Sequence, residues 1–360
     1  MTGVAELGPD SRVGSYRIVR EIGRGGMATV YEAVHSVLPR RAAIKVMHGE
    51  LLRHPGMATR IVQEAAILED VRHAGIVRVF ECNVLPDHRP WIAMELVPGE
   101  TLAQRIHRLH RMVASEVCAL LAEVADVLVA VHARGIVHRD LKPDNLLLTA
   151  SDREFPLRVI DWGVARLGPQ ARLTLDGLTP GTPTYMSPEQ AMGRNIGAPC
   201  DIYSLGVIAY EALCGHPPFD GRSLAEVVAM HLTSVPEPLT EKCEAPPRLC
   251  ALIHGMLDKH PSRRPTGIEV RQIARALALD LSTDEYAEME ISGPLPTLHK
   301  MWPQVVPSDE AVIVDPEVLE LGPTELLPVV RKPRWTPEPG RTIVPKAARD
   351  QIVGEIEVSH

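Results

Sequence analysis

The chain has 360 residues, 45% of them hydrophobic, which is enough to bury a large core in one big domain or two. Its formal net charge of -8 at pH 7, without a local basic patch, argues against nucleic-acid binding. The six cysteines stand singly, with no CxxC pair or zinc-like spacing, and indicate reduced thiols rather than a disulfide framework.

The first residues lack the basic and apolar segments of a secretory signal, and residues 1–15 are expected to form a flexible N-terminus. No apolar run reaches the ~18–20 residues that a membrane span needs. We therefore expect a cytoplasmic protein with neither nucleic acid nor membrane as a partner.

Strand patterns dominate the first hundred residues. From Tyr16, "YRIVREIGRGGMATVYEAVH" alternates apolar and polar residues on both sides of a glycine cluster, which predicts a β-hairpin. "RAAIKVMH", "IVRVFECNV" and "RPWIAMELV" predict three more strands, and "MATRIVQEAAILEDVRH" has the apolar spacing of a helix.

After Gly99 the pattern becomes helical. "SEVCALLAEVADVLVAVHARG" predicts a long helix that ends at a glycine cap. A strand is expected at "LRVIDWG", a loop between Arg166 and Pro188, and helices at "CDIYSLGVIAYEALCG", "SLAEVVAMHLTS", "PPRLCALIHGMLD" and "GIEVRQIARALAL". The order of elements predicts an α+β protein with a small β-rich lobe at about 16–95 and a larger helical lobe at about 100–279. Residues 280–360, dense in proline, are expected to be a largely disordered tail.

Two features of the first lobe point to phosphate chemistry. The loop "IGRGGMATVY" holds glycines between two strands, where backbone N–H groups can approach a phosphate, although such a loop alone is more often a simple turn. Lys45 stands inside the apolar strand "AAIKV", and Glu64 stands among apolar neighbours on the following helix. An ion pair between them would explain why both charged side chains stand among apolar residues. Lys45 considered alone would more often reach solvent at a strand edge.

The stretch "IVHRDLKPDNLLL" crowds polar groups between two apolar runs. Asp140 is suited to accept a hydroxyl proton, Lys142 to neutralise a phosphoryl oxygen, and Asn145 to offer a neutral oxygen to a hard cation. Asp161 follows at the end of the next apolar strand and suits Mg²⁺. Taken singly, these residues would more often serve local hydrogen bonding, a turn or a cap.

Together, in this order, the glycine loop, strand lysine, helix glutamate, "HRDLKPDN", "DWG" and "MSPEQ" resemble the protein kinase superfamily from about Tyr16 to Leu279. Lys142 after Asp140 and "GTPTYMSPEQ" resemble the serine/threonine kinases, and "GGMATVY" and "DIYSLGVIAYEALCGHPPF" resemble their bacterial eukaryotic-like branch. The resemblance implies a bilobal kinase fold and transfer of the γ-phosphate of Mg-ATP, with Mn²⁺ as a substitute cation, to Ser or Thr hydroxyls of protein substrates.

The resemblance also assigns roles to residues. Catalytic roles fall to Asp140, Lys142 and the Lys45–Glu64 pair, and the metal ligands are Asn145 and Asp161. By this resemblance, the loop that covers the ATP phosphates consists of Ile22, Gly23, Arg24, Gly25, Gly26, Met27 and Ala28. The residues expected around the adenine are Val30, Ala43, Met94, Glu95, Val97 and Leu147.

Further residues have structural or regulatory roles by the same resemblance. Glu189 is expected to pair with Arg264, Asp201 to brace the backbone around His138, and Thr182 to bond Asp140. Trp162, which stands where the family has phenylalanine, is expected to pack against the helix of Glu64. Arg139 is expected to meet a phosphothreonine, with Thr174 and Thr179 as the candidates for autophosphorylation in a transient homodimer.

Other interpretations stay open at this stage. One is a pseudokinase or nucleotide-binding scaffold, since Ala28 replaces the third glycine of the loop and Trp162 is larger than phenylalanine. Another is a small-molecule phosphotransferase, which "GTPTYMSPEQ" disfavours. The tail either docks partners through proline-rich segments such as "RKPRWTPEPGR" or is an inert linker.

Overall fold

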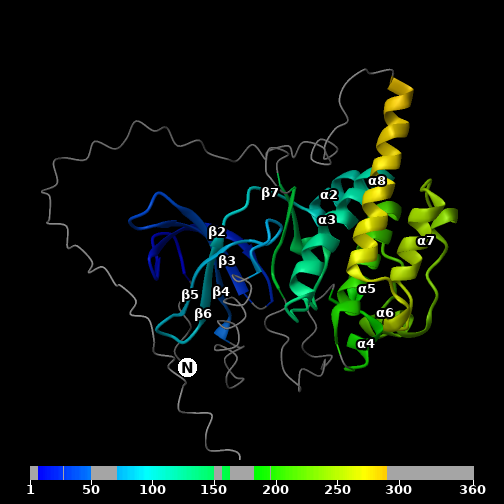
Figure 1. Cartoon of the computed structure of the whole chain (residues 1–360). Helices are drawn as coiled ribbons and strands as arrows, with labels where there is room; N and C mark the ends of the chain where they lie inside the picture. Colours follow the sequence, from blue (N-terminus) through cyan, green and yellow to red (C-terminus); the bar gives the residue numbers. More distant parts are fainter. Residues whose placement is uncertain are drawn as a thin grey trace, which may run out of the picture. The chain divides into compact units, whose positions relative to one another are not determined.

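The structure is a computed structural model that describes residues 7–26, 28–49, 71–149, 156–162, 182–194 and 196–289, with side chains to residue 281. Six of the strands form one antiparallel sheet in the order β1-β2-β3-β4-β6-β5 (Figure 1). Their bounds are Arg12–Val13, Tyr16–Arg24, Ala28–His35, Arg41–Met47, Val79–Val84 for β5 and Pro90–Glu95 for β6.

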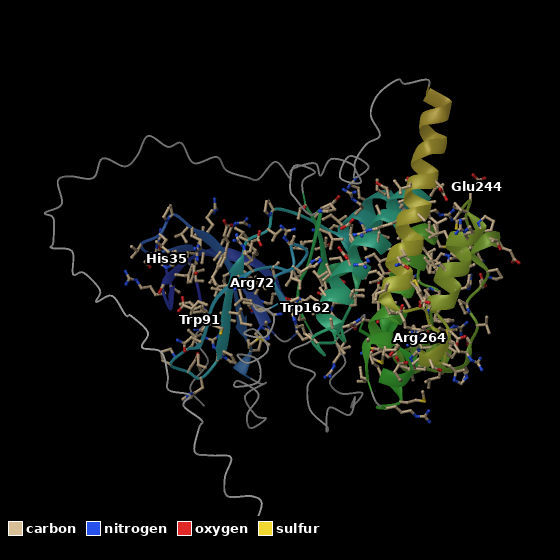
Figure 2. All side chains as sticks on the ribbon, in the orientation of Figure 1. His35, Arg72, Trp91, Trp162, Glu244 and Arg264 are labelled. Atoms are coloured by element: carbon tan, nitrogen blue, oxygen red, sulfur yellow. The ribbon has the colours of Figure 1, made fainter. Side chains whose placement is uncertain are left out.

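The two faces of this sheet have different roles. One face packs a core that includes Tyr16, Ile18, Tyr31, Ile44 and Trp91, the last of which is labelled in Figure 2. On the opposite face, strand register fixes a second group, because Val30 stands across from Lys45 and Ala43 stands across from Met94. Since alternate residues of a strand share a face, the sheet presents these four residues together on the side away from its core.

Residues 96–98 lead from this sheet to a second, three-stranded sheet, β7-β8-β9. Its strands are Gly99–Thr101, Leu146–Thr149 and Leu157–Val159. Gly99 has φ 157°, and a Cβ there would lie 2.0 Å from the carbonyl oxygen of Leu148. Only glycine therefore allows β7 to lie this close to β8, at the point where the chain enters the helical lobe.

Helices make up the remaining described part. Helices α3 and α5 are buried on nearly all sides, because apolar residues occupy most positions around both helices, and α8 packs along α3. The longer elements are α2 Leu102–Leu109, α3 Ala114–His132, α4 Pro188–Ala191, α5 Ala198–Cys214, α6 Leu224–Thr233, α7 Pro247–Met256 and α8 Gly267–Met289, and single turns are η2 Pro143–Asn145, η5 Thr182–Tyr185, η6 Leu239–Glu241 and η7 Pro261–Arg263.

The end of α3 sets the start of the loop that carries the polar residues. Gly135 has φ 72° and donates its backbone N–H to His132 O, while Ile136 donates to Val131 O. This pair of bonds is a Schellman cap, which stops the helix and turns the chain back toward the core. The glycine cap expected from the sequence is therefore present, three residues before His138.

The α+β, two-lobe architecture expected from the sequence is confirmed, but several elements differ. The predicted strand "LRVIDWG" stops at Val159, and α2 was not predicted at all. Helix α8 continues to Met289, past residue 279 where the tail was expected to begin. The predicted helix around Glu64 and the rest of the tail lie outside the described residues. Among the described helices, none has both the length and the apolar character to cross a membrane.

Candidate active site

One buried carboxylate holds the polar loop between α3 and β8. Asp201, on the first turn of α5, accepts the backbone N–H of His138 at 2.8 Å and that of Arg139 at 2.9 Å. His132 Nε2 lies 2.8 Å from the same carboxylate. Burial alone would raise the pKa of Asp201, but the hydrogen bonds from His132 and from the backbone of Arg139 outweigh it and lower the pKa. The brace around His138 that the resemblance implied is thus present.

His138 connects this loop to the strand that leads to Asp161. It is fully buried, and burial lowers its pKa, so the imidazole is neutral. Its Nε2 bonds Ile160 O at 3.1 Å, and its Nδ1 accepts the backbone N–H of Asp140 at 3.3 Å. The ring of Trp162, labelled in Figure 2, lies 4.7 Å from the His138 ring. In the described part of the chain, the buried Trp162 Nε1 finds no hydrogen-bond partner.

Asp140, Lys142 and Asn145 lie close together at the end of this loop, before β8. Lys142 Nζ is 3.5 Å from Asp140 Oδ2, and both side chains are partly exposed. Asn145 donates its amide N–H to Asp140 O at 2.7 Å, which fixes the amide and leaves its Oδ1 available. Asp140 and Lys142 also line a small cavity with Tyr185 of η5. A hydroxyl brought to this cavity would meet a carboxylate with an ammonium beside it.

Lys45 and Asp161 bring the two lobes together. Lys45 Nζ donates to Asp161 Oδ1 at 2.7 Å, although the two residues are 116 positions apart in the sequence. Burial would raise the pKa of Asp161, but the charge and hydrogen bond of Lys45 lower it, so the carboxylate is ionised. Asp161 has φ 55°, a left-handed backbone that turns its side chain back toward β4. The predicted partner Glu64 lies outside the described residues.

The glycine loop joins β2 to β3. Gly25 donates its backbone N–H to Ala28 O at 2.9 Å. A Cβ on Gly23 would meet no atom within 4 Å, and one on Gly25 would meet only Ala28 O at 3.8 Å. Neither glycine has a positive φ among those recorded for the described residues. Packing and turn geometry thus do not require these glycines, whereas a phosphate lying against the backbone would.

His48 was missed by the sequence analysis. Its Nε2 lies 2.9 Å from Thr29 Oγ1, and its Nδ1 lies 3.2 Å from Gly26 O. It therefore braces the glycine loop from the end of β4. A histidine three residues after Lys45 was the available signal, but nothing in the sequence placed it beside the loop. Arg24 instead pairs with Glu21, with contacts of 3.0 and 2.8 Å.

The residues expected around adenine occupy both sheets. Val30, Ala43 and Met94 share the face of Lys45, Ile22 is 38% exposed, and Leu147 is partly exposed on β8. Apolar side chains left partly exposed at these positions are consistent with a flat apolar ligand. Glu95 ends β6 and Val97 lies in the connection between the two sheets.

Helix α4 fastens the segment beyond η5 to the catalytic loop. Gln190 Nε2 donates to Arg139 O at 2.7 Å, and Ser187 caps the helix. Glu189 accepts two bonds from Arg264, at 2.7 and 2.9 Å, the pairing predicted from the sequence. Figure 2 marks Arg264 among the helices. This segment and the loop of Asp140 are therefore held to the same core.

Some predicted site residues cannot be placed. Glu64, Met27, Thr174 and Thr179 lie outside the described residues, and so does the side chain of Thr182. The expected contacts of Thr182 with Asp140, of Arg139 with a phosphothreonine, and of Trp162 with the helix of Glu64 therefore stay predictions. Arg139 itself has φ 65°, because its N–H and that of His138 reach the same carboxylate.

The donor set near Asp161 fits a hard cation. Among the described residues, no cluster of three His, Cys, Asp or Glu side chains could hold a metal alone. The free Oδ1 of Asn145 and the ionised carboxylate of Asp161 supply two oxygens of the kind that Mg²⁺ prefers. A cation here would complete its shell with water and nucleotide phosphates.

Comparison with known proteins places this geometry in a family. The family profile described as "Protein kinase domain" matches residues 16–276. The chain is 39% identical over 274 residues to Serine/threonine-protein kinase Pkn1 of Myxococcus xanthus, covering 74% of this chain and 39% of that protein. It is 38% identical over 280 residues to Serine/threonine-protein kinase pkn2 of the same organism, covering 76% of this chain and 33% of that protein. It is 36% identical over 255 residues to Serine/threonine-protein kinase PknA of Mycobacterium tuberculosis, covering 70% of this chain and 58% of that protein. The chain thus spans between a third and three fifths of the length of these relatives.

Proposed function

The chain belongs to the protein kinase family, and from that premise we propose that it is a serine/threonine protein kinase of the bacterial eukaryotic-like branch. The observation that carries the proposal is a set of contacts at one place: Lys45 with Asp161, and Asp140 with Asn145 and Lys142. Asn145 and Asp161 are further tied by the backbone bond from Ile160 N to Asn145 O at 2.9 Å.

The Lys45 ammonium and the backbone of the glycine loop would hold the phosphates of ATP. Lys45 stands on the same face as Val30 and Ala43, so an adenine against those side chains would place its phosphates toward the lysine. The loop, braced by His48, would cover them with N–H groups that no Cβ shields. The γ-phosphoryl group is thereby directed to the side of Asp161.

Asn145 Oδ1 and Asp161 would hold the divalent cation, with Mg²⁺ as the proposed ion and Mn²⁺ as a substitute. When bound, the cation neutralises charge on the phosphate oxygens. The Lys45–Asp161 pair prepares this position, because the lysine keeps the Asp161 carboxylate ionised and directed into the site.

Asp140 would orient the acceptor hydroxyl and take its proton at a carboxylate oxygen. Its backbone is fixed through His138 and Asn145, so the carboxylate keeps its position while the acceptor binds. Lys142, 3.5 Å from Asp140 Oδ2, would stabilise the negative charge that spreads over the transferred group. Its position two residues after Asp140 is the serine/threonine-type choice, which favours Ser and Thr acceptors.

Regulation and partners are part of the proposal. We infer activation by autophosphorylation at Thr174, Thr179 or both in a transient homodimer, with Arg139 binding the phosphothreonine and Thr182 bonding Asp140. A role in signalling, protein partners docked on the tail, and the cytoplasmic location expected from the sequence stay predictions.

Transfer of radiolabel from the γ-position of Mg-ATP to protein tests this function. The full chain should label itself or an added protein, whereas Asp140→Asn should lose about 10²–10⁴-fold in rate, the usual contribution of a positioned general base. Equal labelling by Asp140→Asn, or no labelling by the unmodified chain, would contradict the proposal. In the second case, retained ATP binding would favour a pseudokinase.

A further inference from the structure

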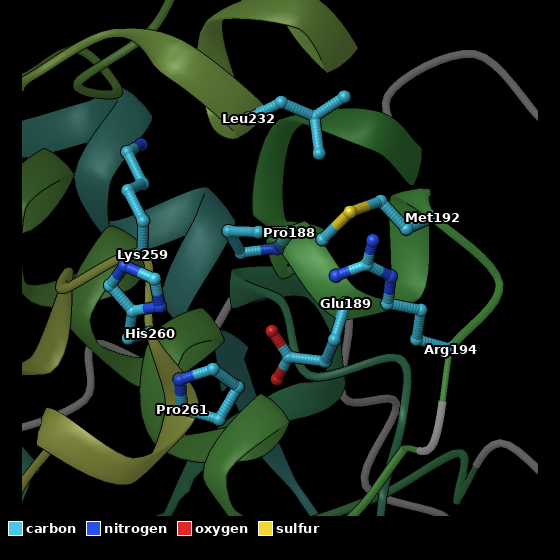
Figure 3. Close-up of a pocket in the computed structure, with 8 residues that line it drawn as sticks. All are labelled: Pro188, Glu189, Met192, Arg194, Leu232, Lys259, His260 and Pro261. Carbon is cyan, nitrogen blue, oxygen red and sulfur yellow. The ribbon is translucent and has the colours of Figure 1, made fainter.

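A cavity in the helical lobe is separate from the proposed ATP site. It has a volume of about 630 Å³ and lies between α4, the end of α6 and the segment that leads into η7 (Figure 3). Pro188 and Met192 line one side, Leu232 another, and Lys259, His260 and Pro261 the third. The volume is in the range of ligand sites.

Beside the cavity, helix α6 has a row of aliphatic side chains that are not fully buried. Helix α6 is rich in aliphatic residues, yet of its residues only Val227 and His231 are buried. Leu224, 37% exposed, begins a row with Val228 and Leu232 at four-residue spacing, which places the three on one face of the helix. Met192, 43% exposed, adds a flexible apolar side chain from α4. Aliphatic side chains that stay partly or fully exposed together in this way are typical of contact surfaces.

The charge of the cavity is positive. Figure 3 shows the Arg194 guanidinium turned toward the cavity beside Met192, and within the described residues no carboxylate pairs with it. Lys259 Nζ bonds only neutral oxygens, Tyr203 OH at 3.3 Å and Met230 O at 3.4 Å, and lies 4.2 Å from the centre of the Phe219 ring. The one acid in the lining, Glu189, is already neutralised by Arg264. An anionic partner is therefore favoured.

The pKa of Lys259 agrees with a site that lacks an anion. Burial, with the charge of Arg264 next, lowers the pKa of Lys259 to about 8. A carboxylate arriving in the cavity would stabilise the charged ammonium and offset part of this cost.

The cavity is close to where a protein substrate would lie. Helix α4 has four residues and is about 6 Å long, at 1.5 Å per residue. On one side Gln190 donates to Arg139 O, next to Asp140, and on another side Pro188 and Met192 face the cavity. A polypeptide whose hydroxyl reaches Asp140 needs only a few more residues to pass α4 and enter the cavity.

We propose that this cavity docks an acidic, leucine-bearing segment of protein substrates, with a carboxylate on Arg194 and aliphatic side chains on Met192, Leu232 and the row along α6. The inference rests on the proposed kinase function, whose substrate class it narrows. Recognition would combine one charged hydrogen bond with apolar burial, the mixture that gives a docking contact both orientation and affinity.

The binding test needs no phosphoryl transfer. A capped, fluorescein-labelled peptide of Glu and Leu residues, without Ser, Thr or Tyr, should bind the full chain, as measured by fluorescence anisotropy. Arg194→Glu should weaken binding by about tenfold or more. Arg248→Glu, an equally exposed arginine outside the lining, should leave binding unchanged. Because the Arg194 side chain makes no bond in the described residues, the variant should melt at the same temperature as the unmodified chain.

Three results would overturn the docking proposal. These are no binding of the peptide, equal binding by Arg194→Glu, and equal binding of a matched peptide with Gln in place of Glu. If Arg194→Glu instead abolished self-association in sedimentation while the peptide failed to bind, the cavity would be a contact between copies of this chain.

A kinetic test connects the site to phosphorylation. A Ser-containing peptide joined to the Glu/Leu segment should have a lower KM than the same peptide without it, and Arg194→Glu should remove that difference without changing kcat. A loss of kcat on both peptides would contradict docking and indicate a catalytic defect. If the proposed kinase function were wrong while the docking site existed, neither peptide would be phosphorylated, but the Glu/Leu peptide would still bind.

Discussion

Two charged pairs in this molecule use the same chemistry under different constraints. Glu189–Arg264 is almost fully buried, with exposed fractions of 6% and 0%, and Arg264 also donates to Pro199 O and Asp258 O. Within the part of the chain that the structure describes, Lys45–Asp161 has one bond, with exposed fractions of 17% and 38%. The first pair is locked by surrounding partners, whereas the second leaves oxygens and N–H groups available to a ligand. The difference separates a pair that supports the fold from a pair that forms a site.

The largest expected effect comes from breaking the locked pair. Arg264→Leu leaves the Glu189 carboxylate buried without its partner, which should lower the free energy of unfolding by about 3–5 kcal/mol. Urea denaturation of the full chain, followed by circular dichroism, measures this. Adding Glu189→Gln should recover part of the loss, and Arg248→Leu, an exposed control, should change stability by about 0.5 kcal/mol or less. A loss below about 1 kcal/mol for Arg264→Leu would contradict the structural role.

The open pair should give the reverse result. Asp161→Asn removes the charge that faces Lys45 and the cation, and should lower the rate of transfer by about 10²–10³-fold. Its free energy of unfolding should change by less than about 1 kcal/mol, because a partly exposed pair contributes little. Asp220→Asn, at an exposed aspartate, is the matched control for both measurements. A large fall in the free energy of unfolding for Asp161→Asn would show that the Lys45–Asp161 pair supports the fold, as the Glu189–Arg264 pair does.

Lowering the pH should reduce the free energy of unfolding through His231, which lies in the same helical lobe as the Glu189–Arg264 pair. This residue is fully buried, with Tyr203 OH at Nδ1 and Thr184 O at Nε2, both at 2.9 Å. Burial, then the charge of Lys259, lowers its pKa from 6.5 to about 4. Between these values the unfolded chain binds more protons, so the stability from neutral His231 is complete above pH 6.5 and decreases toward pH 4.

The total loss in the free energy of unfolding from the protonation of His231 is on the order of 3 kcal/mol. Urea denaturation at several pH values measures it, and His231→Gln should flatten the profile in this window. His107→Gln, at an exposed histidine, should leave the profile unchanged. An unaltered slope in His231→Gln would show that another group is responsible.

The smallest effect is expected at the glycine loop. Gly23→Ala adds a methyl group that meets no protein atom, so stability should stay within about 1 kcal/mol of the unmodified chain. The methyl group would project where a phosphate approaches, and the KM for ATP should rise by about three- to tenfold, or about 1 kcal/mol. Gly8→Ala, also free of contacts but far from the loop in sequence, should change neither quantity. An unchanged KM for Gly23→Ala would remove the ligand explanation for this glycine.

Periodicity predicted most of the fold. The hairpin, the long buried helices and the glycine cap at Gly135 follow from local patterns and appear in the structure. Helix α2 was missed although Thr101 and Gln104 form a capping box at its start, a local signal that was overlooked. The short strands β7 and β8, unlike β9, were not predicted, because they depend on pairing between distant segments, which residue order alone does not reveal.

The site was predictable where a motif kept its spacing and unpredictable where contact depended on tertiary packing. Asp140, Asn145 and Asp161 came from "HRDLKPDN" and "DWG". The bond of Lys45 to Asp161, the brace from His48 and the His132–Asp201 contact were not anticipated. Each joins segments that only the folded chain brings together, so no local pattern records them.

The attachment of the catalytic loop to Asp201 has a consequence for how this molecule loses activity. Besides its internal hydrogen bonds, the loop is fixed through two consecutive N–H groups to a helix that is buried in the large lobe. Local opening of that loop leaves the buried carboxylate of Asp201 without its partners, which costs about 1–3 kcal/mol or more in addition to the other contacts of the loop. Heat inactivation and loss of helical signal should therefore occur in one cooperative transition, with no temperature at which a folded lobe carries a disordered catalytic loop.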